Sequence, residues 1–164
     1  MSTDAIVLLK ADHRDVAKLF TEFERSSTTP ARKRTIVKRV IELLTVHTYL
    51  ENEVMYPEVR RLVPDLEDDV LESYEEHHVA DLLCAELAAL DPKSERYFAK
   101  FTVLMENVRH HVEEEQDWFP QVRAELSRTQ LREMGARMLE LRPSAPTKPS
   151  QPSALKKAVD AVIA

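Results

Sequence analysis

The sequence predicts an all-α protein, an antiparallel up-down four-helix bundle with a short fifth helix and a proline-rich C-terminal tail. Only one glycine occurs in 164 residues, whereas two-sheet folds need many tight turns, which usually contain glycine. Apolar residues also recur at intervals of three and four, as the buried face of an α-helix requires. Finally, the chain contains two copies of one helical hairpin pattern.

Breaks, most of which contain proline, divide the chain into segments of helical periodicity. The expected helices span residues 5–25, 31–57, 66–90, 93–125 and, as the short fifth helix, 127–141. Asp4 is the predicted N-cap of the first helix, because a short acidic side chain can accept hydrogen bonds from the first free amides. Four long helices joined by short loops favour an antiparallel bundle.

We expect one globular domain over residues 1–142 and a proline-rich linker with a short C-terminal segment over residues 143–164. The linker composition is evident in PSAPTKPSQPS at residues 143–153. The final stretch, ALKKAVDAVIA, is interpreted as a loosely ordered tail. The alternative is a short amphipathic helix that docks a protein partner.

Charge and cysteine content indicate the compartment and the partners. The net charge of −6 argues against a nucleic-acid partner. Cys84 is the only cysteine, which excludes an internal disulfide and favours a reducing cytosol. The N-terminus lacks the basic region of a signal peptide, and no segment approaches the ~18 uninterrupted apolar residues of a membrane span. We therefore expect a soluble cytoplasmic protein with no membrane partner.

A shift of 64 residues superimposes a pattern of histidines and glutamates in the two halves of the chain. It matches His13 with His77, His47 with His111, and Glu51 with Glu115. Each half therefore has one lone histidine followed by an HxxxE pair. An aromatic-proline pair follows each HxxxE, but Tyr56-Pro57 and Phe119-Pro120 are offset by 63 residues. The second copy is thus one residue shorter after its glutamate.

Adjacent histidines leave a choice of register in the fourth helix. Alignment on the prolines would select His110 and Glu114, and would bury the polar residues Lys100, Asn107 and Asp117. The 64-residue register instead buries Phe101, Leu104, Val108 and Trp118. Since burying unpaired polar groups costs several kcal/mol, the sequence favours His111 and Glu115. The same argument favours His77 over His78.

The spacing of these residues predicts a metal site in the core. Residues four apart lie on one helical face, with Cβ atoms roughly 5–6 Å apart, so each HxxxE pair can reach one ion or two adjacent ions. A buried carboxylate must be paired or bound to metal, and the inward face offers no lysine or arginine. Nitrogen and oxygen donors suit iron, manganese or zinc rather than calcium. The predicted ligands are His13, His47, Glu51, His77, His111 and Glu115.

The duplicated order of histidine, HxxxE and aromatic-proline pair resembles the hemerythrin-like HHE cation-binding family over about residues 5 to 126. The resemblance implies a non-haem centre of two iron ions with an oxo or hydroxo bridge; zinc and manganese are the alternative ions. It also implies that the four histidines are terminal ligands and that Glu51 and Glu115 bridge the ions.

One departure from the family concerns the fifth histidine of oxygen-carrying hemerythrins, which follows the histidine of the third helix by four residues. This chain has Asp81 at that position. The candidates for an additional or alternative donor are Tyr56, His78, Asp81, His110 and Glu114. For Tyr56, whose repeat partner Phe119 has no phenol, we favour ordinary packing between helices.

Three functions follow from such a site. The first is an enzyme that binds and turns over O2 or hydrogen peroxide, with catalase-like redox chemistry. The second is a sensor or storage module for O2, NO or iron without turnover. The third is a structural zinc site in a partner-binding bundle.

Overall fold

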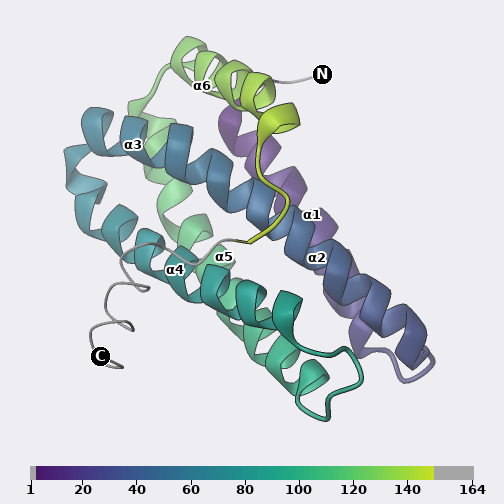
Figure 1. Ribbon diagram of the computed structural model, residues 1–164. Coiled ribbons are helices and arrows are strands. Elements are labelled where there is room, and N and C mark those ends of the chain that lie inside the picture. The colour runs from purple at the N-terminus through teal and green to yellow at the C-terminus, as the bar shows by residue number, and fades with distance from the viewer. Residues whose placement is uncertain (1–2, 150–164) are drawn as a thin grey trace, which may run out of the picture.

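The computed structural model describes residues 3–149, and within this range every regular element is a helix or a helical turn (Figure 1). The elements in order are α1 (Ala5–Glu24), α2 (Pro30–Leu50), the π-helical turn η1 (Glu51–Met55), α3 (Tyr56–Leu62), the 3₁₀ turn η2 (Pro64–Leu66), α4 (Glu67–Ala89), α5 (Tyr97–Glu125), α6 (Arg128–Leu141) and the 3₁₀ turn η3 (Arg142–Ser144). The predicted all-α fold class is confirmed. None of the described helices is both long and apolar enough to cross a membrane.

The four long helical segments pack as two hairpins. Contacts join α1 to α2 and α4 to α5, and further contacts of α2 and α3 with α4, and of α1 with α5, close the bundle. The short helix α6 lies across one end, against α1 (Figure 1). This arrangement gives the bundle an interior to which all four long segments contribute side chains.

Side-chain caps fix where the helices begin. The predicted cap of α1 is confirmed: Asp4 Oδ1 accepts hydrogen bonds from the amides of Ile6 and Val7 at 2.9 and 3.1 Å. Ser127 precedes α6 and forms a reciprocal capping box, in which Ser127 Oγ accepts from the amide of Gln130 and Gln130 Oε1 accepts from the amide of Ser127. These caps satisfy amides that have no partner within the helix.

The second long helix does not end at Pro57, contrary to the expected bound. α2, η1 and α3 follow one another without a break from Pro30 to Leu62. The amide of Tyr56 donates to the carbonyl of Glu51, an i to i−5 bond typical of a π turn. Pro57 then lies in the first turn of α3, where its missing amide hydrogen costs little.

The fourth long helix begins at Tyr97 rather than at residue 93. Asp91 Oδ1 accepts a hydrogen bond from the amide of Lys93 at 2.9 Å, and the amide of Ser94 donates to the carbonyl of Asp91 at 2.8 Å. These local bonds form a turn that competes with the helix. The loop between α4 and α5 is therefore longer than the sequence suggested.

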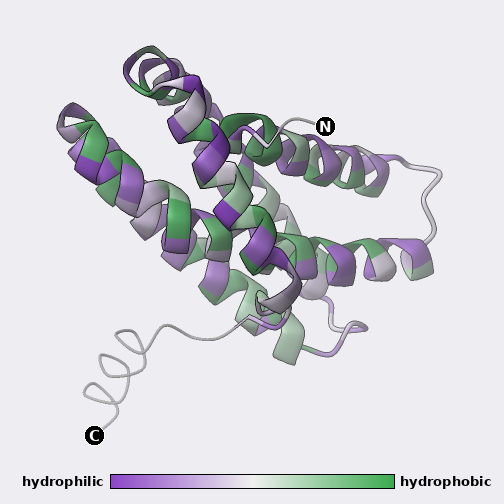
Figure 2. Cartoon of the chain, turned by 90° about the horizontal axis from the view of Figure 1, so that it is seen from above, coloured by the Kyte–Doolittle hydropathy of each residue, from purple (hydrophilic) through white to green (hydrophobic). Residues whose placement is uncertain are grey.

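The core consists of two apolar clusters. One contains Leu9, Leu50, Met55, Phe119 and Met138, and the other contains Phe20, Ile36, Leu44, Phe101 and the predicted core residue Cys84. Figure 2 shows hydrophobic and hydrophilic positions alternating along the helices. Along α1, α2, η1, α4 and α5, the residues that belong to neither cluster but are still buried include the histidines and glutamates of the repeat. A buried polar layer thus separates the two apolar clusters.

The only glycine in the sequence, Gly135, allows α6 to approach the start of the chain. A Cβ at this position would lie 1.5 Å from the carbonyl oxygen of Thr3. Any larger residue would therefore push α6 away from the N-terminal end of α1.

The described part of the predicted linker continues from α6 through η3. Arg142 pairs with Asp12 of α1, with its Nη2 2.9 Å from Asp12 Oδ2, and Ala145 is buried. The predicted C-terminal helix or tail at residues 154–164 lies outside the described residues.

Candidate metal centre

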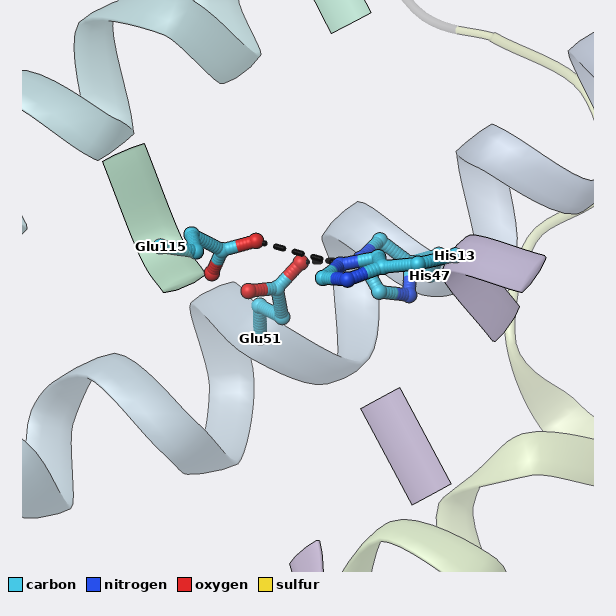
Figure 3. Close-up of side chains that lie close together, drawn as sticks. All are labelled: His13, His47, Glu51 and Glu115. Atoms are coloured by element: carbon cyan, nitrogen blue, oxygen red, sulfur yellow. Dashed lines mark ion pairs between the residues drawn. The ribbon is translucent and has the colours of Figure 1, made fainter. Parts of the chain in front are cut away.

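The six side chains singled out by the repeat lie together in the polar layer. His13 comes from α1, His47 from α2, Glu51 from η1, His77 from α4, and His111 and Glu115 from α5. Both glutamates are 0% exposed, and no histidine of the set is more than 9% exposed. Figure 3 shows four of these side chains pointing toward one another from three segments of the bundle.

The donor atoms form two groups that share Glu51. His13, His47, Glu51 and Glu115 each offer an atom within 4.8 Å of the others, and so do Glu51, His77 and His111. Glu115 Oε1 lies 3.2 Å from His13 Nε2 and 3.1 Å from His111 Nε2. Glu51 Oε1 contacts His47 Nε2 and lies 3.6 Å from His77 Nε2. One oxygen of each glutamate therefore lies between a histidine of the first half and a histidine of the second.

The chemistry of these donors fits metal ions. Several of their buried polar atoms have no hydrogen-bond partner, namely His13 Nε2, His47 Nε2, Glu51 Oε1, Glu51 Oε2 and Glu115 Oε1. No lysine or arginine of residues 3–149 is buried, so only histidines face the two carboxylates. Buried charges require a partner of opposite sign, and imidazole with carboxylate suits iron, manganese and zinc.

A second layer of acceptors orients three of the histidines. His47 Nδ1 lies 3.1 Å from Asp12 Oδ2, and His111 Nδ1 lies 3.0 Å from Glu76 Oε1. His77 Nδ1 lies 2.8 Å from Asn52 Oδ1. An acceptor at Nδ1 holds the proton there and leaves Nε2 free to face a metal.

These acceptors were not predicted from the sequence, although one signal for them was present. Asp12 and Glu76 each precede the lone histidine of their half, and they are related by the same 64-residue shift as the histidines. Asn52 carries no such signal, because its repeat partner Gln116 accepts no comparable bond among the contacts of the described residues.

Tyr56 brings a hydroxyl group into the centre. Its hydroxyl donates to Glu115 Oε2 at 3.1 Å and lies 3.0 Å from His77 Nε2 and 3.4 Å from His111 Nε2. The side chain is 0% exposed. Burial first, and then the charges of Glu115 and Glu51, raise the pKa of the phenol well above its usual value.

Comparison with known proteins agrees with this arrangement. The family model for the hemerythrin HHE cation binding domain matches residues 4–122. The chain belongs to this family. A protein named DNA nickase from Nostoc sp. (strain PCC 7120 / SAG 25.82 / UTEX 2576) is 31% identical over 124 residues, which are 75% of this chain and 34% of the relative. The chain thus spans about a third of that relative's length, and no solved structure matches the chain.

The electrostatics of the HHE domain divide its histidines into two kinds. Burial opposes the charged form of His47, but the charge of the Glu51 carboxylate and the hydrogen bond with Asp12 raise its pKa to about 10. Burial likewise opposes the charge of His111, yet Glu115 and Glu76 raise its pKa to about 11. Metal ions must therefore displace protons from these two imidazoles at neutral pH.

His77 behaves in the opposite way. Burial, reinforced by the positive charges of the neighbouring histidines, lowers its pKa to about 3 despite the nearby Glu51. Its imidazole is thus neutral and ready to act as a ligand. Glu115 stays ionised, because the charge of His111 and the close contacts with His111 and His13 outweigh burial and hold its pKa well below the usual value.

Of the additional donors proposed from sequence, only Tyr56 reaches the centre. Asp81 lies 3.5 Å from Thr48 Oγ1, and burial raises its pKa to about 6. Neither Asp81 nor His78 belongs to any cluster of candidate ligands in residues 3–149. His110 and Glu114 face outward, where they pair with each other at 2.8 Å. The register chosen from the apolar face of α5 thus places His111, and not His110, in the core.

A cavity of about 310 Å³ lies beside the HHE site. It borders all four histidines of the centre, His13, His47, His77 and His111. The apolar part of its wall includes Val16, Phe20, Leu44, Ala80, Val108 and Val112. A small molecule can therefore approach the imidazoles through a largely apolar space.

Proposed function

We propose that this HHE domain binds two iron ions between the four histidines and the two glutamates, and that it binds and turns over O2 or hydrogen peroxide there. The observation that supports this most directly is the position of the two glutamates, each with an oxygen between histidines of opposite halves. Such a carboxylate can bridge two ions.

In this proposal the two metal positions differ in their protein ligands. His13 and His47 hold the first ion, His77 and His111 hold the second, and Glu51 and Glu115 bridge them. Tyr56 is an additional donor to the second position only, because its hydroxyl lies beside His77 and His111. The second position is therefore the more crowded, and the first is the more open to a small ligand.

Two bound iron ions supply Lewis acidity and reversible one-electron redox change, which are the requirements for O2 or peroxide chemistry. The chain supplies geometry, because Asp12, Glu76 and Asn52 hold the imidazoles in place.

Metal analysis and peroxide turnover test this function. Protein purified without added metal should contain iron rather than zinc or manganese. Iron-loaded protein should release O2 from hydrogen peroxide faster than the same concentration of free iron, and the Glu51→Gln variant should not. Turnover no faster than free iron would contradict the enzyme, and reversible O2 binding without turnover would then favour the sensor or store.

A further inference from the structure

We propose that Glu76, His110 and Glu114 form a third, peripheral site for a divalent transition-metal ion, and that the core centre is loaded through it. Their ligand atoms lie within 4.8 Å of one another on the adjoining surfaces of α4 and α5. His110 Nε2 lies 2.8 Å from Glu114 Oε1 and 3.6 Å from Glu76 Oε2. One imidazole and two carboxylates are a donor set that suits Fe²⁺, Mn²⁺ or Zn²⁺.

Exposure decreases across the three residues from solvent to core. The side chains of His110, Glu114 and Glu76 are 62%, 31% and 11% exposed. Glu76 in turn holds the core histidine His111 through its other oxygen, at 3.0 Å. An ion bound here would share the Glu76 carboxylate with a ligand of the centre.

One carboxylate oxygen of Glu76 lacks the hydrogen bond that a buried acceptor normally makes. Glu76 Oε2 is buried and has no hydrogen-bond partner, and it lies 3.6 Å from His110 Nε2. An unsatisfied buried carboxylate oxygen is costly. A cation between Glu76, His110 and Glu114 would remove that cost.

In the first half of the molecule, a basic side chain pairs with the equivalent carboxylate. Asp12, the repeat partner of Glu76, also holds a core histidine, His47. The Asp12 carboxylate also accepts hydrogen bonds from Arg142, whose Nη1 and Nη2 lie 3.2 and 2.9 Å from its two oxygens. Glu76 has no arginine in this role, and an imidazole with a second carboxylate stands there instead. Two acids beside one imidazole leave a negative charge that a divalent ion neutralises.

Binding at this site does not depend on the function proposed above, whereas its role in loading does. Crystals of the full chain soaked in Mn²⁺ should show an anomalous peak between His110 and Glu114, separate from peaks at the core. His110→Ala and Glu114→Gln should each abolish the peripheral peak and keep the core peaks, while the matched control Glu113→Gln keeps both. Core peaks without a peripheral peak would overturn this inference, and a peripheral peak without core peaks would contradict the core centre instead.

The loading role is tested by the rate at which the apoprotein takes up Fe²⁺. His110→Ala and Glu114→Gln should slow uptake by the core about tenfold or more, because a cation site near the core raises the local metal concentration, and the final metal content of the core should stay unchanged. Glu113→Gln and His78→Ala should load at the rate of the unmodified chain. Equal slowing in ligand and control variants would show general charge attraction and would overturn the loading role.

Discussion

The two halves of the bundle have the same helical pattern, but the first half is one residue longer between its glutamate and the aromatic residue that follows it. Tyr56 follows Glu51 by five residues, whereas Phe119 follows Glu115 by four. The extra residue lies in the π turn η1, where the hydrogen bonds span five residues. This turn explains why the repeat shift changes from 64 to 63 after the glutamate.

The π turn keeps the aromatic residue on the same face in both halves. The ring of Tyr56 stacks on His77 with centroids 5.0 Å apart, and the ring of Phe119 stacks on His13 at 6.3 Å. Each lone histidine is thus covered by the aromatic ring of the other half. The scaffold is symmetric, and its chemistry is not, because only Tyr56 adds a hydroxyl to the centre.

The largest effect should come from the glutamate that belongs to both donor groups. Glu51→Ala should lose about two ions per chain, because Glu51 contributes to each group. His13→Ala should lose only the ion of the first group. Metal content by mass spectrometry of the purified variants measures this, with circular dichroism as the control for folding. Equal losses in the two variants would contradict a shared Glu51.

The raised pKa values of His47 and His111 predict a steep pH dependence of metal affinity. Both pKa values, about 10 and about 11, lie above neutrality, so loading releases about two protons and the overall affinity should rise about 100-fold per unit between pH 6 and 8. Calorimetry in buffers of different ionisation enthalpy counts the protons. Loading without proton release would contradict these assignments.

The same pKa values set the pH dependence of stability in the apoprotein. Groups with raised pKa stabilise the fold below their unfolded value of about 6.5 and lose that contribution as the pH rises through about 10 to 11. The contribution of His77 to stability depends on pH in the opposite direction. Its pKa of about 3 means that the unfolded chain binds the proton more tightly, so stability should fall as the pH drops from about 6.5 to 3. Urea unfolding measured from about pH 3 to about pH 11 tests both predictions.

A smaller effect should follow from changing the acceptors behind the histidines. Asp12→Asn and Glu76→Gln keep the shape but lose the charge, and each should lower metal affinity about 10–100-fold. Competition with a chelator measures the change, and Asp15→Asn on the exposed side of α1 is the matched control. If only one half responds, the two acids do not play the equivalent roles that their geometry indicates.

The smallest effect on binding should come from Tyr56→Phe, which makes the two halves chemically alike. The variant should retain its metal, because the four histidines and two glutamates stay in place. It should lose any phenolate-to-iron absorption in the visible spectrum, and its stability should change by about 1 kcal/mol with the loss of one buried hydroxyl. An identical visible spectrum in the variant would show that Tyr56 is not a ligand.

Much of this fold follows from local patterns. Apolar spacing indicated the helices, and Asp4 was identified as a cap because its chemistry is local. The choice of His111 over His110 also followed from the sequence, since the wrong register would have buried Lys100. The buried face of a helix is marked by the apolar spacing within that one helix, so it can be predicted from the sequence.

The contacts between helices were decided only by the tertiary structure. Neither the hydrogen bond from His47 to Asp12 nor that from His77 to Asn52 follows from spacing, because each depends on how two helices are turned against each other. The continuation of the helix past Pro57, and with it the direction of the Tyr56 hydroxyl, required the π turn. The amino-acid sequence therefore determined which residues face inward, and packing determined which of their atoms meet, because helical periodicity fixes a face but not the distance to its neighbour.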